Sequence, residues 1–248
     1  MKILAVAFAY NEHRYIENFI KFYKSQGCDI FVLDNSSTDG TTECLQKHGI
    51  NHKLIATGGA FDLKMLQRGL LKQIREQKPD WVVYTGVDVR YYFREKTIKD
   101  AIFEATREGY NLIGVQYFNM YATGEPFALP LEKNFFYARK YGRIYMIARY
   151  IEPFCFEADS IIIPEKKILQ SDGCLINYGN CKPAVEREDT FRRRKKAWDR
   201  GLDRNYGVHY NEGHERGWRW DKKEMIDIRT TEYYDYINNS DRGKKKTI

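Results

Sequence analysis

The sequence predicts an α/β fold with a mostly parallel central sheet flanked by helices. In the first half of the chain, apolar runs of strand length alternate with segments in which apolar residues recur at helical spacing. Repeated β-α-β units of this kind produce a parallel sheet with helices on both faces. The 248 residues, 43% hydrophobic and 30% charged, suffice for one domain with a large core. This composition excludes a disordered tail and a membrane-spanning protein.

Five strands are predicted in the first half of the chain. Residues 3–8 are a continuous apolar run, which is typical of a strand covered on both faces. The other strands are separated by turn residues such as the Pro79-Asp80 pair, and all but the one at 51–55 are mainly apolar. They cover residues 30–33, 51–55, 81–84 and 112–118.

Helices are predicted between these strands, because apolar residues recur there at intervals of three and four. The first helix ends at Gly27 and the last at Gly109, since glycine is favoured just after a helix. A polar turn at residues 34–40 is suited to cap a further, short helix. The apolar faces consist of Ile16, Phe19, Ile20 and Tyr23, then Leu63, Leu66, Leu70 and Ile74, then Ile98, Ala101, Ile102 and Ala105.

The second half of the chain is less regular. Residues 119–150 are rich in Tyr, Phe and Arg but show little periodicity, so no element is predicted there. A short strand at residues 160–163 is ended by Pro164. Residues 186–200 form a charged helix that contains the basic run 192–196, which we interpret mainly as a solvated helix face.

The charge balance narrows the class of partner. Lys and Arg number 41 against 34 Asp and Glu, which gives a net charge of +7. That excess favours an anionic partner, namely a nucleotide, a phosphorylated lipid or glycan, a membrane surface, or nucleic acid. The five cysteines are odd in number and form no CxxC pair, so we expect a reducing, cytoplasmic compartment. No stretch is apolar enough to span a bilayer, so we expect any membrane contact to be peripheral.

Polar and acidic residues follow several predicted strands at the point where each strand ends. Asn11 and Glu12 follow the first strand, Asp34 follows the second, and Asp88 follows the strand at 81–84. The carboxyl ends of parallel strands meet at one edge of a sheet, where ligands bind. The sequence has neither GxGxxG after the first strand nor GxxxxGK[ST], which argues against a dinucleotide fold and a P-loop enzyme. A divalent metal bridging carboxylate to phosphate is another way to hold a diphosphate at an acidic edge.

Three segments carry a resemblance to a known family. They are Ala-Tyr-Asn-Glu at 9–12, Phe-Val-Leu-Asp-Asn-Ser-Ser-Thr-Asp-Gly-Thr at 31–41, and Asp-Trp-Val-Val-Tyr-Thr-Gly-Val-Asp at 80–88. In this order they resemble the opening of family-two glycosyltransferases of the GT-A fold, whose third segment carries a metal-binding DxD motif. Gly86 stands where the first aspartate of that motif is usual. The donor-binding residues assigned from the resemblance, which covers residues 1–118, are Asn11, Glu12, Asp34, Arg68 and Asp88.

The resemblance implies an enzyme that moves a sugar from a nucleotide diphosphate donor to an acceptor hydroxyl, with inversion, the acceptor being a glycan or surface polysaccharide. Asp88 is then expected to bind Mn²⁺ or Mg²⁺, with His209 as a further ligand. Asp189 resembles the family's general base, and Asp159 is the reserve candidate. Part of the basic run 192–196 is expected to meet donor phosphates or an anionic acceptor.

Two alternatives stay open. One is a glycosyltransferase that acts on modified bases in DNA, which the basic charge permits. The other is a catalytically decayed GT-A module that binds a nucleotide or a glycan, which the altered DxD motif permits. In each case we expect a single domain at residues 1–228, with a nucleotide-binding half at 1–118 and an acceptor half at 119–228. Residues 229–248 are expected to form a partly mobile extension.

Overall fold

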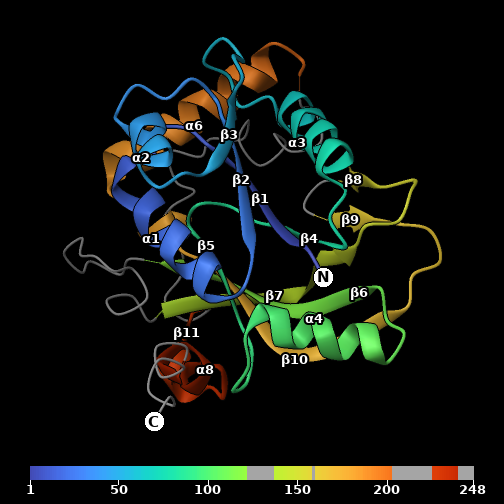
Figure 1. Ribbon diagram of the computed structural model, residues 1–248. Helices are drawn as coiled ribbons and strands as arrows, with labels where there is room; N and C mark the ends of the chain where they lie inside the picture. The colour runs from blue at the N-terminus through green and yellow to red at the C-terminus, as the bar shows by residue number, and fades with distance from the viewer. Residues whose placement is uncertain (122–136, 158–159, 203–224, 240–248) are drawn as a thin grey trace.

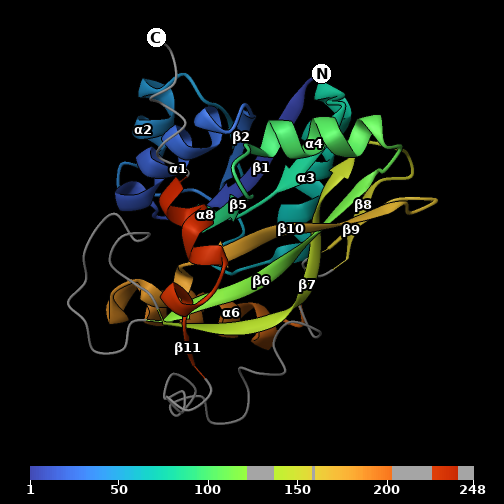
Figure 2. The ribbon, with the colours of Figure 1, turned by 90° about the horizontal axis from the view of Figure 1, so that it is seen from below.

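The computed structural model of the protein describes residues 1–121, 137–157, 160–202 and 225–239 (Figure 1). Helices lie on both sides of a central sheet, and Figures 1 and 2 show α1 (His13–Ser25) and α3 (Leu63–Gln77) on opposite sides of β1 (Ile3–Ala9). This is the layered α/β arrangement predicted from the sequence.

The sheet has the order β3-β2-β1-β4-β7-β6-β10-β5, with β11 also paired to β7. Strands β3, β2, β1 and β4 pair in parallel. Strand β7 runs antiparallel to both β4 and β6, so β6 points the same way as β4, and β10 is parallel to β6. Along the main path only β7 and β5 are therefore reversed, which confirms a mostly parallel sheet. The strands not yet bounded are β2 (Asp29–Asp34), β3 (Asn51–Leu54), β4 (Trp81–Tyr84), β5 (Val89–Tyr92), β6 (Leu112–Tyr121), β7 (Tyr137–Arg149), β10 (Ile168–Asn177) and β11 (Ile226–Asp227).

The predicted strands and helices of the first half are all present. Strands β1, β2 and β4 are apolar because they are covered on both faces, and nearly all of their residues are buried. The apolar face of α1, including Phe19 and Tyr23, is buried in the same core. The helices α2 (Thr41–Lys47) and α4 (Ile98–Arg107) complete this half. Helix α4 begins with a capping box between Thr97 and Asp100, which the apolar periodicity alone did not indicate.

The prediction of no regular element in residues 119–150 was wrong. Strand β6 continues to Tyr121, and β7 occupies Tyr137–Arg149. Strands β5, β10 and β8 (Cys155–Glu157) were missed as well. The short strand predicted at 160–163 is present as β9 (Ser160–Ile162), which pairs with β8 in a hairpin. The pairings of β6 with β7 and of β6 with β10 contain register shifts. Such irregularities break the strict alternation by which a strand is identified in a sequence.

The chain after residue 225 begins by packing against the sheet. Strand β11 pairs with β7, and Ile228 is fully buried. In α8 (Tyr233–Asn239), Tyr236 and Ile237 are buried, and the Tyr233 ring meets the Phe118 ring edge-on at 5.1 Å. The first part of the predicted extension thus contributes to the core. In the described ranges, no helix combines the length and apolarity that crossing a bilayer requires.

Candidate functional site

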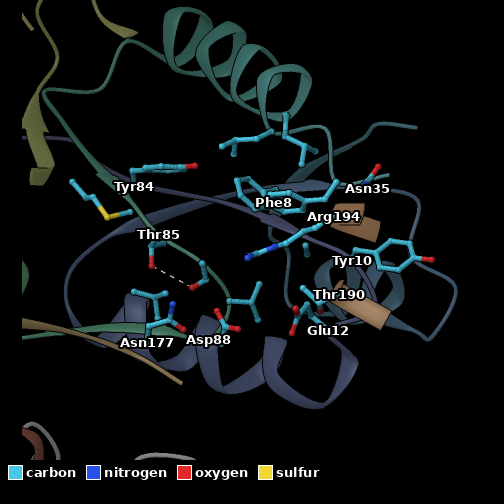
Figure 3. Close-up of a pocket in the computed structure, with 18 of the residues that line it drawn as sticks. Phe8, Tyr10, Glu12, Asn35, Tyr84, Thr85, Asp88, Asn177, Thr190 and Arg194 are labelled. Atoms are coloured by element: carbon cyan, nitrogen blue, oxygen red, sulfur yellow. Dashed lines mark hydrogen bonds between the residues drawn. The ribbon is translucent and has the colours of Figure 1, made fainter. Parts of the chain in front are cut away.

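A cavity of about 190 Å³ lies at the carboxyl ends of β1 and β4 (Figure 3). This is the edge at which open parallel sheets bind ligands. Helix α6 (Ala184–Asp199) contributes Thr190, Arg193 and Arg194 to its wall. The remaining lining residues are Phe8, Ala9, Tyr10, Glu12, Asn35, Phe61, Leu63, Leu66, Tyr84, Thr85, Gly86, Val87, Asp88, Val89, Tyr117, Ile144, Met146, Leu175, Asn177 and Lys182.

One wall of the cavity is aromatic. The Phe8 ring meets Phe61 edge-on at 5.4 Å and lies 6.3 Å from the ring of Tyr84. Figure 3 shows Tyr84 and Phe8 on one side of the space and Glu12 and Asp88 on the other, with Arg194 reaching between them. A cavity with an aromatic wall and a charged wall suits a ligand that joins a flat ring to anionic groups.

The charged wall is organised around Lys182. Its Nζ donates to both carboxylate oxygens of Glu12 at 2.7 and 2.8 Å, and lies 3.0 Å from Asp88 Oδ2. It also lies 4.8 Å from the centre of the Tyr15 ring. The side chains of Lys182, Glu12 and Asp88 are 9%, 17% and 21% exposed. Lys182 therefore joins the loop after β1 to the turn after β4 in the wall of the cavity.

Burial and mutual attraction shift the pKa values of this cluster. Burial raises the pKa of Glu12 to about 7, although Lys182 opposes the shift. Burial would also raise the pKa of Asp88, but the adjacent Lys182 ammonium outweighs it and lowers that pKa. The two carboxylates together hold the pKa of Lys182 above its usual value, against the effect of burial. Near neutral pH the cluster thus keeps an ammonium and one firmly ionised carboxylate.

Two arginines of α6 face the same space. The Arg193 guanidinium lies 3.5 Å from the centre of the Tyr10 ring, and that of Arg194 lies 5.1 Å from the centre of the Phe61 ring. The Phe61 N–H donates to the Arg193 carbonyl at 3.0 Å, which fixes the helix against the aromatic wall. Within the described ranges, no atom accepts a hydrogen bond from the buried Arg193 Nε. Desolvation lowers the pKa of Arg193.

The basic run of α6 is therefore divided between two environments. Arg192 and Lys195 are 71% and 53% exposed and pair with Asp189 and Asp199 on the surface. Arg193 instead lines the cavity, as does its neighbour Arg194. The interpretation as a solvated face holds for the first pair, whereas the second pair is placed to meet anionic groups of a ligand.

Among the predicted donor-binding residues, Glu12 and Asp88 line the cavity. Asn11 and Asp34 instead hold the loops beside it. Asn11 Oδ1 accepts a hydrogen bond from the Thr38 N–H at 2.8 Å. Asp34 is fully buried. Its carboxylate accepts hydrogen bonds from the N–H and hydroxyl of Ser37 and from the hydroxyl of Thr42. Its neighbour Asn35 reaches the cavity wall.

The other predicted residues lie elsewhere or outside the described ranges. Arg68 is exposed on α3 and lines a separate hollow formed by that helix. Asp189 is 41% exposed, pairs with Arg192 at 3.2 Å and does not line the cavity. Asp159 and His209 lie outside the described residues.

Several cavity residues were not predicted. Lys182 is a single lysine in an irregular segment after β10, where no sequence pattern marks it. Asn177 is the last residue of β10, and Tyr117 lies on β6. The centre of the Tyr117 ring lies 5.2 Å from that of Tyr141. The aromatic composition of residues 117–150 was the one available signal for Tyr117, but composition does not say which tyrosine faces a cavity.

The residues around Asp88 do not fit the divalent cation that the resemblance implies. The carboxylates of Asp88 and Glu12 are both bonded to the Lys182 ammonium. In the part of the chain that the structure describes, no three His, Cys, Asp or Glu side chains are grouped to hold a metal ion. At Gly86, a Cβ atom would lie 3.1 Å from Asp88 Oδ1. These side chains are arranged to hold an ammonium group.

Comparison with known proteins finds similarity at the level of structure. No family model and no curated protein matches the sequence. The chain is similar to S. aureus TarS, with 13% identity and a TM-score of 0.48 over 87% of this chain and 46% of TarS. For S. aureus TarS 1–349 in complex with UDP-GlcNAc, the identity is 17% and the TM-score 0.39, over 54% of this chain and 39% of TarS 1–349. The chain is also similar to glucosyl-3-phosphoglycerate synthase from Mycobacterium tuberculosis in complex with Mn²⁺, UDP and glucosyl-3-phosphoglycerate. The identity is 20% and the TM-score 0.33, over 50% of this chain and 45% of the synthase. Each of these three alignments covers less than half of the known protein.

Proposed function

We propose that this protein is a glycosyltransferase that uses a nucleotide diphosphate sugar as donor. The observation that carries the proposal is the convergence of three motif segments on one cavity. Glu12 follows β1, Asn35 follows β2 and Asp88 follows β4, and all three line the same space as Arg193. Phosphate groups bind well to arginine because its planar guanidinium offers several hydrogen-bond donors.

The shape and charge of the cavity suggest how the donor lies. The nucleoside binds along the aromatic wall, near Phe8 and Asn35. The diphosphate lies between Arg193 and Lys182, where the cations of the site are gathered. The sugar then extends toward Tyr117 on β6, because an aromatic face suits the apolar face of a sugar ring.

In the proposed reaction, an acceptor hydroxyl attacks the anomeric carbon of the donor sugar. The new bond joins the acceptor oxygen to that carbon, and the bond from the carbon to the diphosphate oxygen breaks. The leaving nucleoside diphosphate takes the electron pair, and a carboxylate takes the hydroxyl proton. Asp189 stays the proposed base, with Asp159 in reserve, and we propose a glycan as the acceptor.

Thermal shifts with UDP, GDP, CDP, dTDP and their sugar conjugates test the proposal. A ligand that binds only the folded state stabilises it by RT ln(1 + [L]/Kd), which is about 2.7 kcal/mol at a hundredfold excess over Kd. We expect one nucleotide series to raise the melting temperature of the wild-type protein and to lose that effect in Arg193→Gln. If none of these ligands shifts the melting temperature, the proposal is wrong.

The base is tested separately from donor binding. Asp189→Asn is expected to lower the rate of sugar transfer while leaving the Kd of the donor unchanged, because the base acts only on the acceptor hydroxyl. Glu188→Gln, at the exposed neighbouring position on α6, is the matched control. Equal transfer rates in the two variants would move the assignment to Asp159.

A further inference from the structure

We infer that Lys182 supplies, at the donor diphosphate, the positive charge that a divalent cation would otherwise provide, so that donor binding does not depend on a divalent metal. The inference rests on the proposed function, because it concerns how the same cavity holds its donor. It departs from the metal dependence that the sequence resemblance implies.

The position of Lys182 is the first reason. Its Nζ lies within 3.0 Å of Glu12 and of Asp88, the two acidic cavity residues that end predicted motifs. A cation bound between these carboxylates would occupy the same place. Lys182 also lines the cavity, and its side chain keeps 9% of its surface exposed, so it is not sealed within the core.

The second reason is that the backbone holds this arrangement rigidly. The Tyr178 N–H donates to the Asp88 carbonyl at 2.9 Å, and the short helix Gly179–Cys181 leads directly into Lys182. At Gly179 a Cβ atom would lie 3.0 Å from Asp88 Oδ2, so the chain passes close to the carboxylate. A cation held this way is in place before the donor arrives, which lowers the entropic cost of binding an anion.

The third reason is the total charge around the cavity. Lys182, Arg193 and Arg194 are three covalently attached cations on its wall. Because Asp88 is the one carboxylate of the cluster that stays firmly ionised near neutral pH, the three cations outweigh it and leave a net positive charge for the diphosphate. The site therefore holds an anionic ligand with side chains alone, whereas an empty pair of carboxylates would repel it.

Calorimetric binding to UDP, GDP, CDP and dTDP, with and without EDTA and with millimolar Mn²⁺, tests the inference. For the wild-type protein we expect the Kd of the bound nucleotide to change by less than about twofold between EDTA and Mn²⁺. This arm needs no substitution, so it does not depend on the folding of a variant. A Kd that rises about tenfold or more in EDTA would overturn the inference while leaving the proposed function intact.

Lys182→Ala supplies the second arm, with Lys195→Ala on the exposed face of α6 as the matched control. We expect Lys182→Ala to weaken nucleotide binding by about tenfold or more in EDTA, and Mn²⁺ to restore part of it through the vacated carboxylates. The control should bind like the wild type in both media. If a folded Lys182→Ala protein binds as tightly as the wild type in EDTA, Lys182 is only a structural bridge and the inference fails. Absence of nucleotide binding by the wild-type protein in every medium would instead contradict the proposed function.

Discussion

Lys182 Nζ lies 2.7 and 2.8 Å from the two carboxylate oxygens of Glu12, although 170 residues separate them in the chain. Because Asp88 shares the same ammonium, the contact unites the ends of β1 and β4 with the segment after β10. The segment ending at Asp88 resembles a metal-binding motif in the sequence. In the structure its carboxylate pairs with the Lys182 ammonium instead. The predictions below concern this cluster and the residues that surround it.

Arg193→Gln should weaken nucleotide diphosphate binding without changing the fold. A hydrogen bond to a charged group contributes about 1.5–3 kcal/mol, which corresponds to roughly a 10- to 150-fold rise in Kd. Arg192→Gln is the control, because Arg192 is 71% exposed and pairs with Asp189 on the surface. Calorimetry of both variants would show the difference. A similar Kd for the two would mean that the diphosphate lies away from Arg193.

Binding of a nucleotide sugar should weaken as the pH rises through about 7. The pKa of Glu12 is raised to about 7, mainly by burial, so Glu12 is neutral below that pH and anionic above it. The added negative charge repels the donor diphosphate, and we expect a roughly threefold to tenfold rise in Kd. The charged groups that act on Glu12 are Lys182, Asp88, Glu186 and Arg193.

The measurement is the Kd of the nucleotide sugar from pH 6 to pH 8, a range of about one unit on either side of the Glu12 pKa. A sugar conjugate is preferable to the free nucleoside diphosphate, because its diphosphate does not titrate in this range. Glu12→Gln should show a flat profile. An unchanged slope in that variant would assign the titration to another group.

Gly86→Asp restores the usual DxD pattern but should not by itself create a tight Mn²⁺ site. The carboxylates of Glu12 and Asp88 remain bonded to Lys182 in that variant. Combined with Lys182→Ala, the same substitution should give a clear gain in Mn²⁺ affinity, since oxygen ligands then surround an empty position. Calorimetric titration with Mn²⁺ checks this, with Gly86→Asn plus Lys182→Ala as control. Equal Mn²⁺ affinity of the single and double variants would contradict the expectation.

Asp34→Ala should destabilise the protein even without nucleotide. Asp34 is fully buried and accepts hydrogen bonds from Ser37 and Thr42, so its loss leaves these half-buried donors unpaired and a small cavity in place of the carboxylate. We expect the free energy of unfolding to fall by roughly 2–4 kcal/mol in denaturant titrations. Asp29→Ala, at the exposed start of the same strand, should change it little. If Asp34→Ala leaves stability unchanged but lowers nucleotide affinity, Asp34 is a nucleotide contact, as the sequence predicts.

The sequence by itself determined the α/β class and, apart from β5, the elements of the first half. Strands β1 and β4 and the interior of β2 are apolar, and the buried face of α1 follows helical spacing. Both patterns are local, because they depend on which residues along the chain face the core. It also indicated Glu12 and Asp88 as cavity residues, since the ends of parallel strands must share one edge.

Only the tertiary structure decided what those residues contact. The pairing of Lys182 with Glu12 and Asp88 depends on how β10 and the segment after it pack against the first half of the chain. Likewise, the packing of α6 decides that Arg193 lines the cavity while Arg192 stays in solvent. The physical reason is that burial and long-range contact set the charge and the partners of an ionisable side chain. Neither quantity is encoded in the spacing of residues along the sequence.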